Sequence, residues 1–147
     1  LYMDNANVWF ITLTDVDSKV MKAITCTINS TIFSVLGKAG ANPQTGEYYK
    51  FNKQFLTPIP LPAARLRPES EDVQRLSTMF DEISELQDRY LSATQNQKEI
   101  FKRALKEKWT ALDNACFDLY EVTDSEKAQI QAIGRTISRI DLLNGAE

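Results

Sequence analysis

The chain lacks histidine altogether, the side chain that most often serves proteins as a general base or a metal ligand. Its two cysteines, Cys26 and Cys116, lie 90 positions apart, a spacing that excludes a zinc ribbon. No glycine-rich loop for phosphate or dinucleotide binding follows an expected strand. These absences predict that the chain has no catalytic residues and no metal site, and that it is not an enzyme by itself.

Long apolar runs are also missing, and no signal peptide is expected. No stretch approaches the roughly 20 apolar residues that a membrane-spanning helix needs. Both cysteines fall on apolar helical faces, which is typical of buried thiols in the reducing cytosol. We therefore expect a cytoplasmic protein without a membrane partner. The chain starts at Leu1 and runs at once into apolar residues, which suggests a fragment of a longer protein.

The most informative stretch is residues 46–62, GEYYKFNKQFLTPIPLP. Aromatic residues alternate here with Lys50 and Lys53, ahead of three prolines. Each proline removes a backbone donor and restricts the residue before it to extended geometry, so residues 58–62 are expected to form a short edge strand or a polyproline segment. Lysines suit phosphates and flat rings suit bases or sugars. The pattern is therefore typical of a nucleic-acid contact loop.

The charge of the chain is unevenly distributed. The total of −3 argues against free-standing DNA binding, but residues 37–67 carry five cations and one glutamate, a net of +4. Residues 1–36 sum to −1 and residues 68–147 to −6. Because steering depends on the local field, a basic patch on an acidic body still attracts phosphate. A solvated loop with incidental lysines is the alternative interpretation.

Hydrophobic spacing divides the chain into two regions. Residues 7–14 predict a buried strand, and residues 19–36 predict a helix that is broken near Asn29 and Ser30. Beyond Pro68, glycine is absent up to residue 133, and amphipathic helices are predicted at about 69–92, at about 97–120 and from Thr123 onward. Thr123 and Glu126 match a capping box. The short polar connection at 91–97 allows the first two helices to pack only as an antiparallel hairpin.

The predicted fold class is therefore α+β, a small mixed α/β subdomain followed by an antiparallel helical hairpin or bundle. Residues 1–67 are assigned to the C-terminal part of a recognition subdomain and residues 68–147 to a helical spacer or docking region.

The order of these motifs resembles the C-terminal target-recognition, or specificity, region of bacterial restriction–modification proteins. That family includes single-chain type IIG enzymes, which fuse an adenine-N6 DNA methyltransferase to a specificity domain, and the specificity subunits of type I systems. The residues that carry the resemblance lie within about 24–62 and 109–133: Ile28, Asn29, Ser30, Gly37, Gly40, the run 48–53, Ile59, Pro60, Leu61, Pro62, Leu112, Asp113, Asp118, Leu119, Tyr120, Val122, Thr123, Asp124, Ser125 and Glu126.

The resemblance implies double-stranded DNA as a partner and helices that act as spacers or that dock recognition domains on a catalytic body. That body would be the catalytic domain of the same parent chain or a separate methyltransferase subunit. S-adenosylmethionine would belong to the missing catalytic domain, and no cofactor is expected in this chain. Asn42-Pro43-Gln44-Thr45 resembles half of the amine-binding motif of an adenine methyltransferase, but the second proline and the aromatic ring are absent. We interpret it as a turn.

The predicted role of the chain is DNA sequence recognition within a larger methyltransferase or restriction enzyme. Asn52 and Gln54 suit adenine edges in the major groove, and lysines suit phosphate or guanine. The expected DNA contacts are Lys38, Tyr48, Tyr49, Lys50, Asn52, Lys53 and Gln54. Two alternatives stay open: a helical interaction or oligomerisation module, including a homodimer through the helices, without DNA contact; and an enzyme active only when joined to a missing methyltransferase or nuclease portion.

Overall fold

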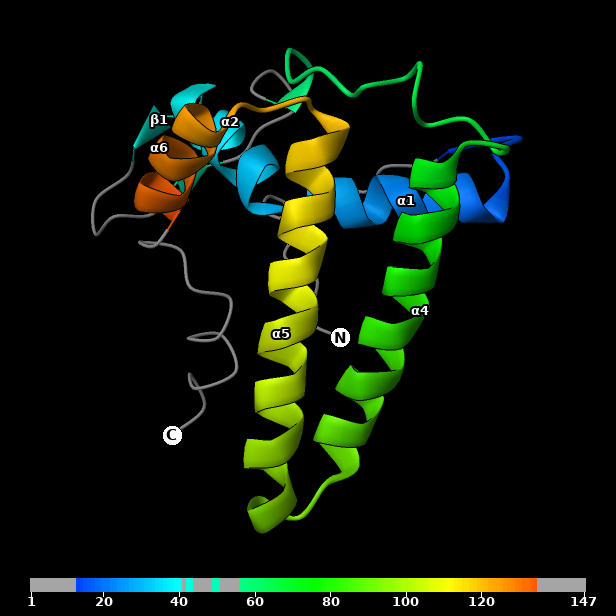
Figure 1. The fold of residues 1–147 in the computed structure, drawn as a ribbon, viewed down its shortest axis with the longest axis vertical. Helices are drawn as coiled ribbons and strands as arrows, with labels where there is room; N and C mark the ends of the chain where they lie inside the picture. Colours follow the sequence, from blue (N-terminus) through cyan, green and yellow to red (C-terminus); the bar gives the residue numbers. More distant parts are fainter. Residues whose placement is uncertain (1–12, 41, 44–48, 51–55, 135–147) are drawn as a thin grey trace.

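The computed structural model describes residues 13–40, 42–43, 49–50 and 56–134, and this part of the chain is mainly helical (Figure 1). The helices are α1 (Ser18–Ile28), α2 (Thr31–Gly40), α4 (Glu71–Ser92), α5 (Gln95–Leu119) and α6 (Asp124–Gly134). Two strands of two residues each, β1 (Asn42–Pro43) and β2 (Tyr49–Lys50), pair antiparallel.

The predicted α+β fold class is wrong. β1 and β2 are too short to form a sheet layer, and α1 and α2 pack on other helices instead. Most of the strand predicted at residues 7–14 lies outside the described residues, and its last two positions, Leu13 and Thr14, are not in a strand. The fold class could not be predicted correctly because hydrophobic spacing does not specify what α1 and α2 pack against.

The proline-rich stretch is not an edge strand either. The backbone N–H of Ile59 donates to Leu56 O at 3.1 Å, and the N–H of Arg65 donates to Pro62 O at 2.9 Å. These bonds within the segment are turns, and proline is common at turn positions because its φ is preset. Residues 56–70 therefore form a chain of turns that leads into α4.

Helices α4 and α5 form an antiparallel hairpin that dominates the molecule (Figure 1). Ser70 caps α4, its Oγ accepting from Val73 N at 3.2 Å, and such a cap stabilises a helix start by about 1 kcal/mol. At the start of α5, Gln97 Oε1 accepts from both N and Oγ1 of Thr94. The connection is thus only Ala93 and Thr94, shorter than the sequence pattern suggested.

Helix α1 lies across the end of the hairpin where α4 begins and α5 ends (Figure 1). The predicted break near Asn29 and Ser30 is confirmed, since α1 ends at Ile28 and α2 begins at Thr31. Buried Ser30 bridges the break: its Oγ donates to Thr27 O at 2.6 Å and accepts from Phe33 N at 3.3 Å. The bend between the two helices is 61°.

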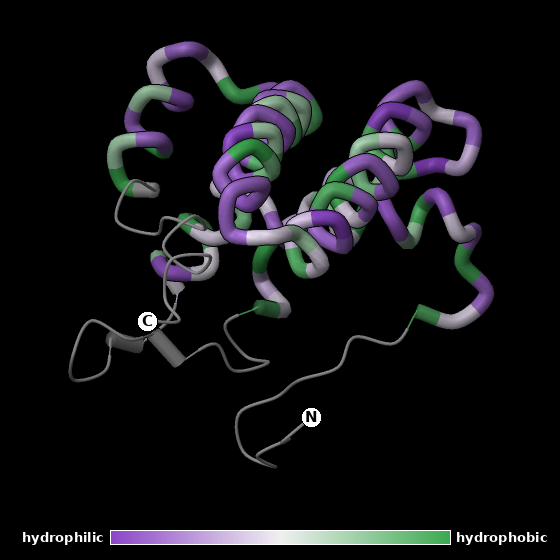
Figure 2. The backbone as a smooth tube through the Cα atoms, turned by 90° about the horizontal axis from the view of Figure 1, so that it is seen from below, coloured by the Kyte–Doolittle hydropathy of each residue, from purple (hydrophilic) through white to green (hydrophobic). Residues whose placement is uncertain are grey.

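One hydrophobic core joins α1 and α2 to the hairpin. The helices are amphipathic, with hydrophilic and hydrophobic residues alternating along each of them (Figure 2). The core residues come from α1, α2, the turn segment, α4 and α5: Val20, Ala23, Cys26, Ile32, Leu66, Val73, Leu76, Ile83, Leu105, Leu112, Ala115, Cys116, Phe117 and Leu119. Both cysteines are buried, as the sequence predicted.

Within the described ranges, no single helix is both long enough and apolar enough to cross a membrane. Helices α1 and α2 reach that length and composition only when they are taken together as a bent pair.

Candidate nucleic-acid interface

The predicted DNA contacts lie at and after the C-terminal end of α2. Lys38 is in the last turn of α2 and is half-buried, while Tyr49 and Lys50 form β2. The β1–β2 pairing puts Lys50 opposite Asn42, so its backbone lies beside the chain that has just left α2. Tyr48, Asn52, Lys53 and Gln54 lie outside the described residues. The fold thus brings Lys50 near the helix end that carries Lys38.

Helix α2 is held at its other end by a carboxylate from the hairpin. Asp113 of α5 accepts two hydrogen bonds from Thr31, from the backbone N at 2.7 Å and from Oγ1 at 2.6 Å. A carboxylate at a helix N-terminus satisfies free N–H groups and opposes the positive end of the helix dipole. Asp113 therefore orients α2, and with it the predicted basic segment, relative to α5. The sequence pattern gave no signal for this long-range cap.

Helix α1 is attached to α4 by both packing and polar contacts. Lys22 Nζ contacts both carboxylate oxygens of Asp81 at 2.7 and 2.8 Å, and buried Cys26 donates its S–H to Leu76 O at 3.4 Å. Exposed ion pairs contribute little stability, about 0–1 kcal/mol. The buried side chains of α1, such as Ala23, supply most of the attachment.

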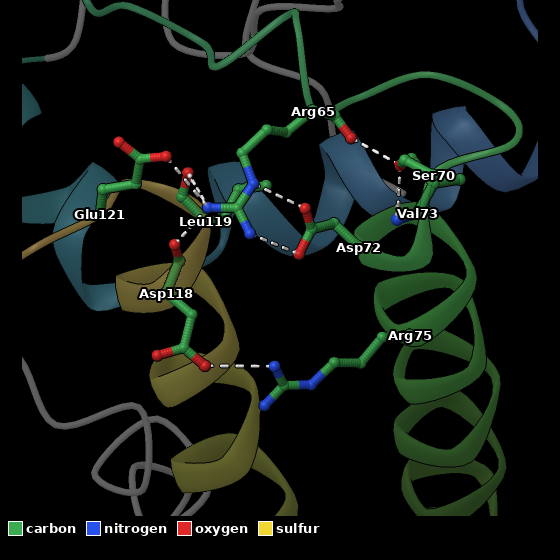
Figure 3. A network of polar contacts seen from close by, with 8 residues as sticks. All are labelled: Arg65, Ser70, Asp72, Val73, Arg75, Asp118, Leu119 and Glu121. Carbon is green, nitrogen blue, oxygen red and sulfur yellow. Dashed lines mark hydrogen bonds and ion pairs between the residues drawn. The ribbon is translucent and has the colours of Figure 1, made fainter.

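The turn segment that follows the predicted interface is fastened to the hairpin by Arg65 (Figure 3). Its Nε and Nη2 donate to the two carboxylate oxygens of Asp72 at 2.7 and 3.0 Å. Its Nη1 donates to the carbonyl oxygens of Asp118 at 2.6 Å and Leu119 at 3.4 Å, and it lies 3.8 Å from a carboxylate oxygen of Glu121. We call these five residues the Arg65 clamp. It joins residues 56–70, α4 and the end of α5.

Neighbouring groups reinforce the clamp. Ser70 Oγ donates to the backbone oxygen of Arg65 at 2.6 Å, and the Tyr120 hydroxyl donates to Pro60 O at 3.0 Å. The hydrogen bond to Asp72 raises the pKa of Arg65 above its ordinary value, so its charge is permanent. The turn segment is therefore tied to the hairpin at two points, Pro60 and Arg65.

The clamp changes the composition of the basic patch. Arg65 was counted among its five cations, but the carboxylate of Asp72 neutralises its charge. Bidentate pairing of this kind holds the guanidinium in place. The remaining cations of residues 37–67 are Lys38, Lys50, Lys53 and Arg67, and three of these four lie in the predicted contact segment.

The remaining polar groups do not gather into another kind of site. In the part of the chain that the structure describes, no three side chains of His, Cys, Asp or Glu lie close enough to share a metal ion. Each buried side-chain nitrogen or oxygen there has a hydrogen-bond partner. Burial, reinforced by Asp81, raises the pKa of the Cys26 thiol to about 12, which keeps it protonated at neutral pH.

Comparison of the chain with family models, with curated proteins and with solved structures finds no match.

The half-buried Tyr120 and the buried thiol of Cys26 predict a loss of stability in alkali. Burial raises the pKa of Tyr120 to about 12 as well, from an ordinary value of 10.0, and Cys26 rises from 9.0. Folding thus favours the neutral forms of both groups. Their contribution to the free energy of unfolding is complete below about pH 9 and is lost as the pH rises toward 12. The free energy of unfolding, measured by urea titration, should fall in this range. The double variant Cys26→Ala, Tyr120→Phe should show a shallower fall, and an identical pH profile would contradict the assignment.

Proposed function

We propose that this chain is the end of a DNA target-recognition region, joined to a helical spacer, of a bacterial restriction–modification adenine methyltransferase or restriction enzyme. The observation that carries the proposal is the fastening of the predicted contact segment to one end of a long hairpin. Asp113 fixes the start of α2 before that segment, and the Arg65 clamp fixes the chain after it. A segment held on both sides is suited to presenting side chains to a rigid duplex.

The dimensions of the hairpin suit a spacer. Helix α5 has 25 residues, so it is about 37 Å long at 1.5 Å per residue, close to the roughly 34 Å of one helical turn of DNA. A hairpin of this length can hold a recognition segment about one DNA turn away from another body. In the proposed parent, that body is the catalytic domain that holds S-adenosylmethionine, either in the same chain or in a separate subunit.

The division of charge supports the same arrangement. Residues 68–147, which contain the hairpin, sum to −6, and such a surface repels the phosphate backbone. Positive charge is concentrated instead in residues 37–67. DNA is thus attracted to the contact segment and repelled by the α4–α5 hairpin that carries it.

A salt titration of duplex DNA binding tests the proposal. Each phosphate contact contributes about −0.9 to the slope of log affinity against log salt. Replacing Lys50 and Lys53 together with alanine should therefore reduce the slope by up to about 1.8. The matched control replaces two exposed cations of α5, Arg103 and Lys106, and should leave the slope unchanged. Equal slopes for the wild type and the Lys50/Lys53 variant would remove this segment from the DNA interface.

One observation favours a second candidate, a helical interaction module without DNA contact. Leu91 and Ile100 are 75% and 69% exposed in the part of the hairpin near its tip, and exposed apolar side chains that form a patch are typical of protein contacts. Such a module would form a homodimer through this tip. Sedimentation of the wild type and of a Leu91→Ser, Ile100→Ser variant tests this candidate. It would be favoured if the wild type were a dimer that does not bind DNA and the variant were a monomer.

A further inference from the structure

A half-open cavity of about 270 Å³ lies where α1 crosses the hairpin, at some distance along the chain from the predicted DNA contacts. Its base is apolar and buried, formed by Cys26, Ile83 and Leu112. Two half-buried rings, those of Phe80 and Trp109, also line it. Buried apolar surface with flat rings favours a planar, largely apolar ligand.

The polar side chains of this cavity have hydrogen-bonding capacity to spare. Asn29 Nδ2 donates to Thr25 O at 2.9 Å, which leaves its Oδ1 as an acceptor. Among the described residues, Ser84 and Gln87 make no hydrogen bond through their side chains. An amide and a hydroxyl can each donate and accept. The cavity therefore suits a ring that carries donors and acceptors on its edge, rather than a hydrocarbon.

The charge and size of the cavity further restrict the class of ligand that it can bind. Among the described residues, those that line the cavity are all uncharged. Two carboxylates next to it on α4 are paired, Asp81 with Lys22 at 2.7 Å and Glu82 with Lys108 at 2.6 Å. An anionic or cationic ligand would find no counter-charge there. The volume lies just below the roughly 300–1,000 Å³ of sites for drug-sized ligands, so it suits a single small ring system and not a whole nucleotide.

We propose that this cavity binds a neutral nucleobase, with the ring against Phe80 and Trp109 and its polar edge at Asn29, Ser84 and Gln87. Adenine is the expected base, because an amide side chain pairs with the adjacent donor and acceptor of its edge. Stacking on aromatic side chains and hydrogen bonding to the base edge are the two interactions by which proteins hold unpaired bases. This site goes beyond the proposed function, which assigns DNA contact to residues 38–54.

Titration with adenosine, in the absence of DNA, tests the site through the fluorescence of Trp109. A Trp9→Phe background, checked by circular dichroism, leaves Trp109 as the single tryptophan. We expect saturable quenching with a Kd of about 1 mM. Ser84→Leu, which fills the cavity from α4, should weaken binding at least about tenfold. Thr78→Leu, an exposed position on the same helix, is the matched control and should bind adenosine like the background chain.

Two results would overturn the inference: no saturable quenching by adenosine, or equal affinity in the Ser84→Leu and Thr78→Leu variants. Equal binding of uncharged indole would show that the polar edge is not recognised and would overturn it too. The base could come from a free nucleoside or from DNA, and an oligonucleotide with one unpaired adenine separates these sources by whether it competes with adenosine. Because the adenosine titration contains no DNA, its failure would leave the lysine salt titration unaffected.

Discussion

Replacing Arg65 with methionine is expected to lower the free energy of unfolding by about 2 kcal/mol, since charge-assisted hydrogen bonds contribute about 1.5–3 kcal/mol. The side chains of Arg65 and Asp72 are 34% and 21% exposed, so solvent screens the pair only in part and the estimate stays at the lower end. Removal of the guanidinium leaves Asp72 and the carbonyl oxygens of Asp118 and Leu119 without their donor. Urea or thermal unfolding measures the loss, about 6 °C in Tm.

Arg75→Met is the matched control, because Arg75 also contacts Asp118, at 3.1 Å (Figure 3). The two side chains of this second pair are 47% and 58% exposed, and exposed pairs contribute about 0–1 kcal/mol. Arg65→Lys should retain part of the stability, because an ammonium cannot make the bidentate contact. A loss in Arg65→Met no larger than that in Arg75→Met would show that the clamp does not fasten the turn segment.

The contacts of Arg65 also show which features could not be predicted from the sequence. Its partners at Asp118 and Leu119 lie 53 and 54 positions away, and no local pattern encodes such a pairing. In the sequence, Arg65 was counted as one of the cations of the basic patch. In the fold, it attaches the turn segment to α4 and α5. The Asp113 cap on Thr31, across 82 positions, was invisible for the same reason.

Two local signals were reliable. The break at Asn29 and Ser30 and the capping box at Thr123 depend only on neighbouring residues, and both are observed: Thr123 N donates to Glu126 Oε2 at 2.9 Å, and Glu126 N donates to Thr123 Oγ1 at 3.4 Å. The hydrogen bonds from Thr123 also lower the pKa of Glu126. The fold class depended instead on what α1 and α2 pack against, which is tertiary information. That is why the predicted α/β subdomain failed while the helical periodicity did not.

The cavity between α1 and the hairpin was equally hidden from the sequence. Trp109 and Phe80 were placed on helices by periodicity, yet their meeting with Asn29 depends on where α1 crosses. Ser84 lies in the helix predicted at about 69–92, and it lines the cavity only because α1 crosses α4 beside it. Helical periodicity along α4 does not specify that crossing.

If the chain belongs to the proposed methyltransferase or restriction enzyme, changes at the predicted contact residues of that intact enzyme should separate base reading from DNA positioning. A bidentate contact to a base edge is worth about 1–3 kcal/mol of discrimination, so Asn52→Ala or Gln54→Ala should relax specificity at one base pair by roughly ten- to a hundredfold. Lys50→Ala removes a predicted phosphate contact and should weaken action evenly on all sequences. Methylation of a randomised site library, read by sequencing, distinguishes these two outcomes.

Comparing the amide variants with the lysine variant distinguishes base reading from phosphate contact, because the changes are made within one short segment of the same protein. Lys106→Ala, on the exposed face of α5, is the control and should alter neither activity nor consensus. If the Asn52 and Gln54 variants lower activity uniformly and keep the consensus intact, the segment positions DNA without reading it. If all the variants, Lys50→Ala included, match the control, DNA does not contact this segment, and the helical interaction module becomes the favoured function.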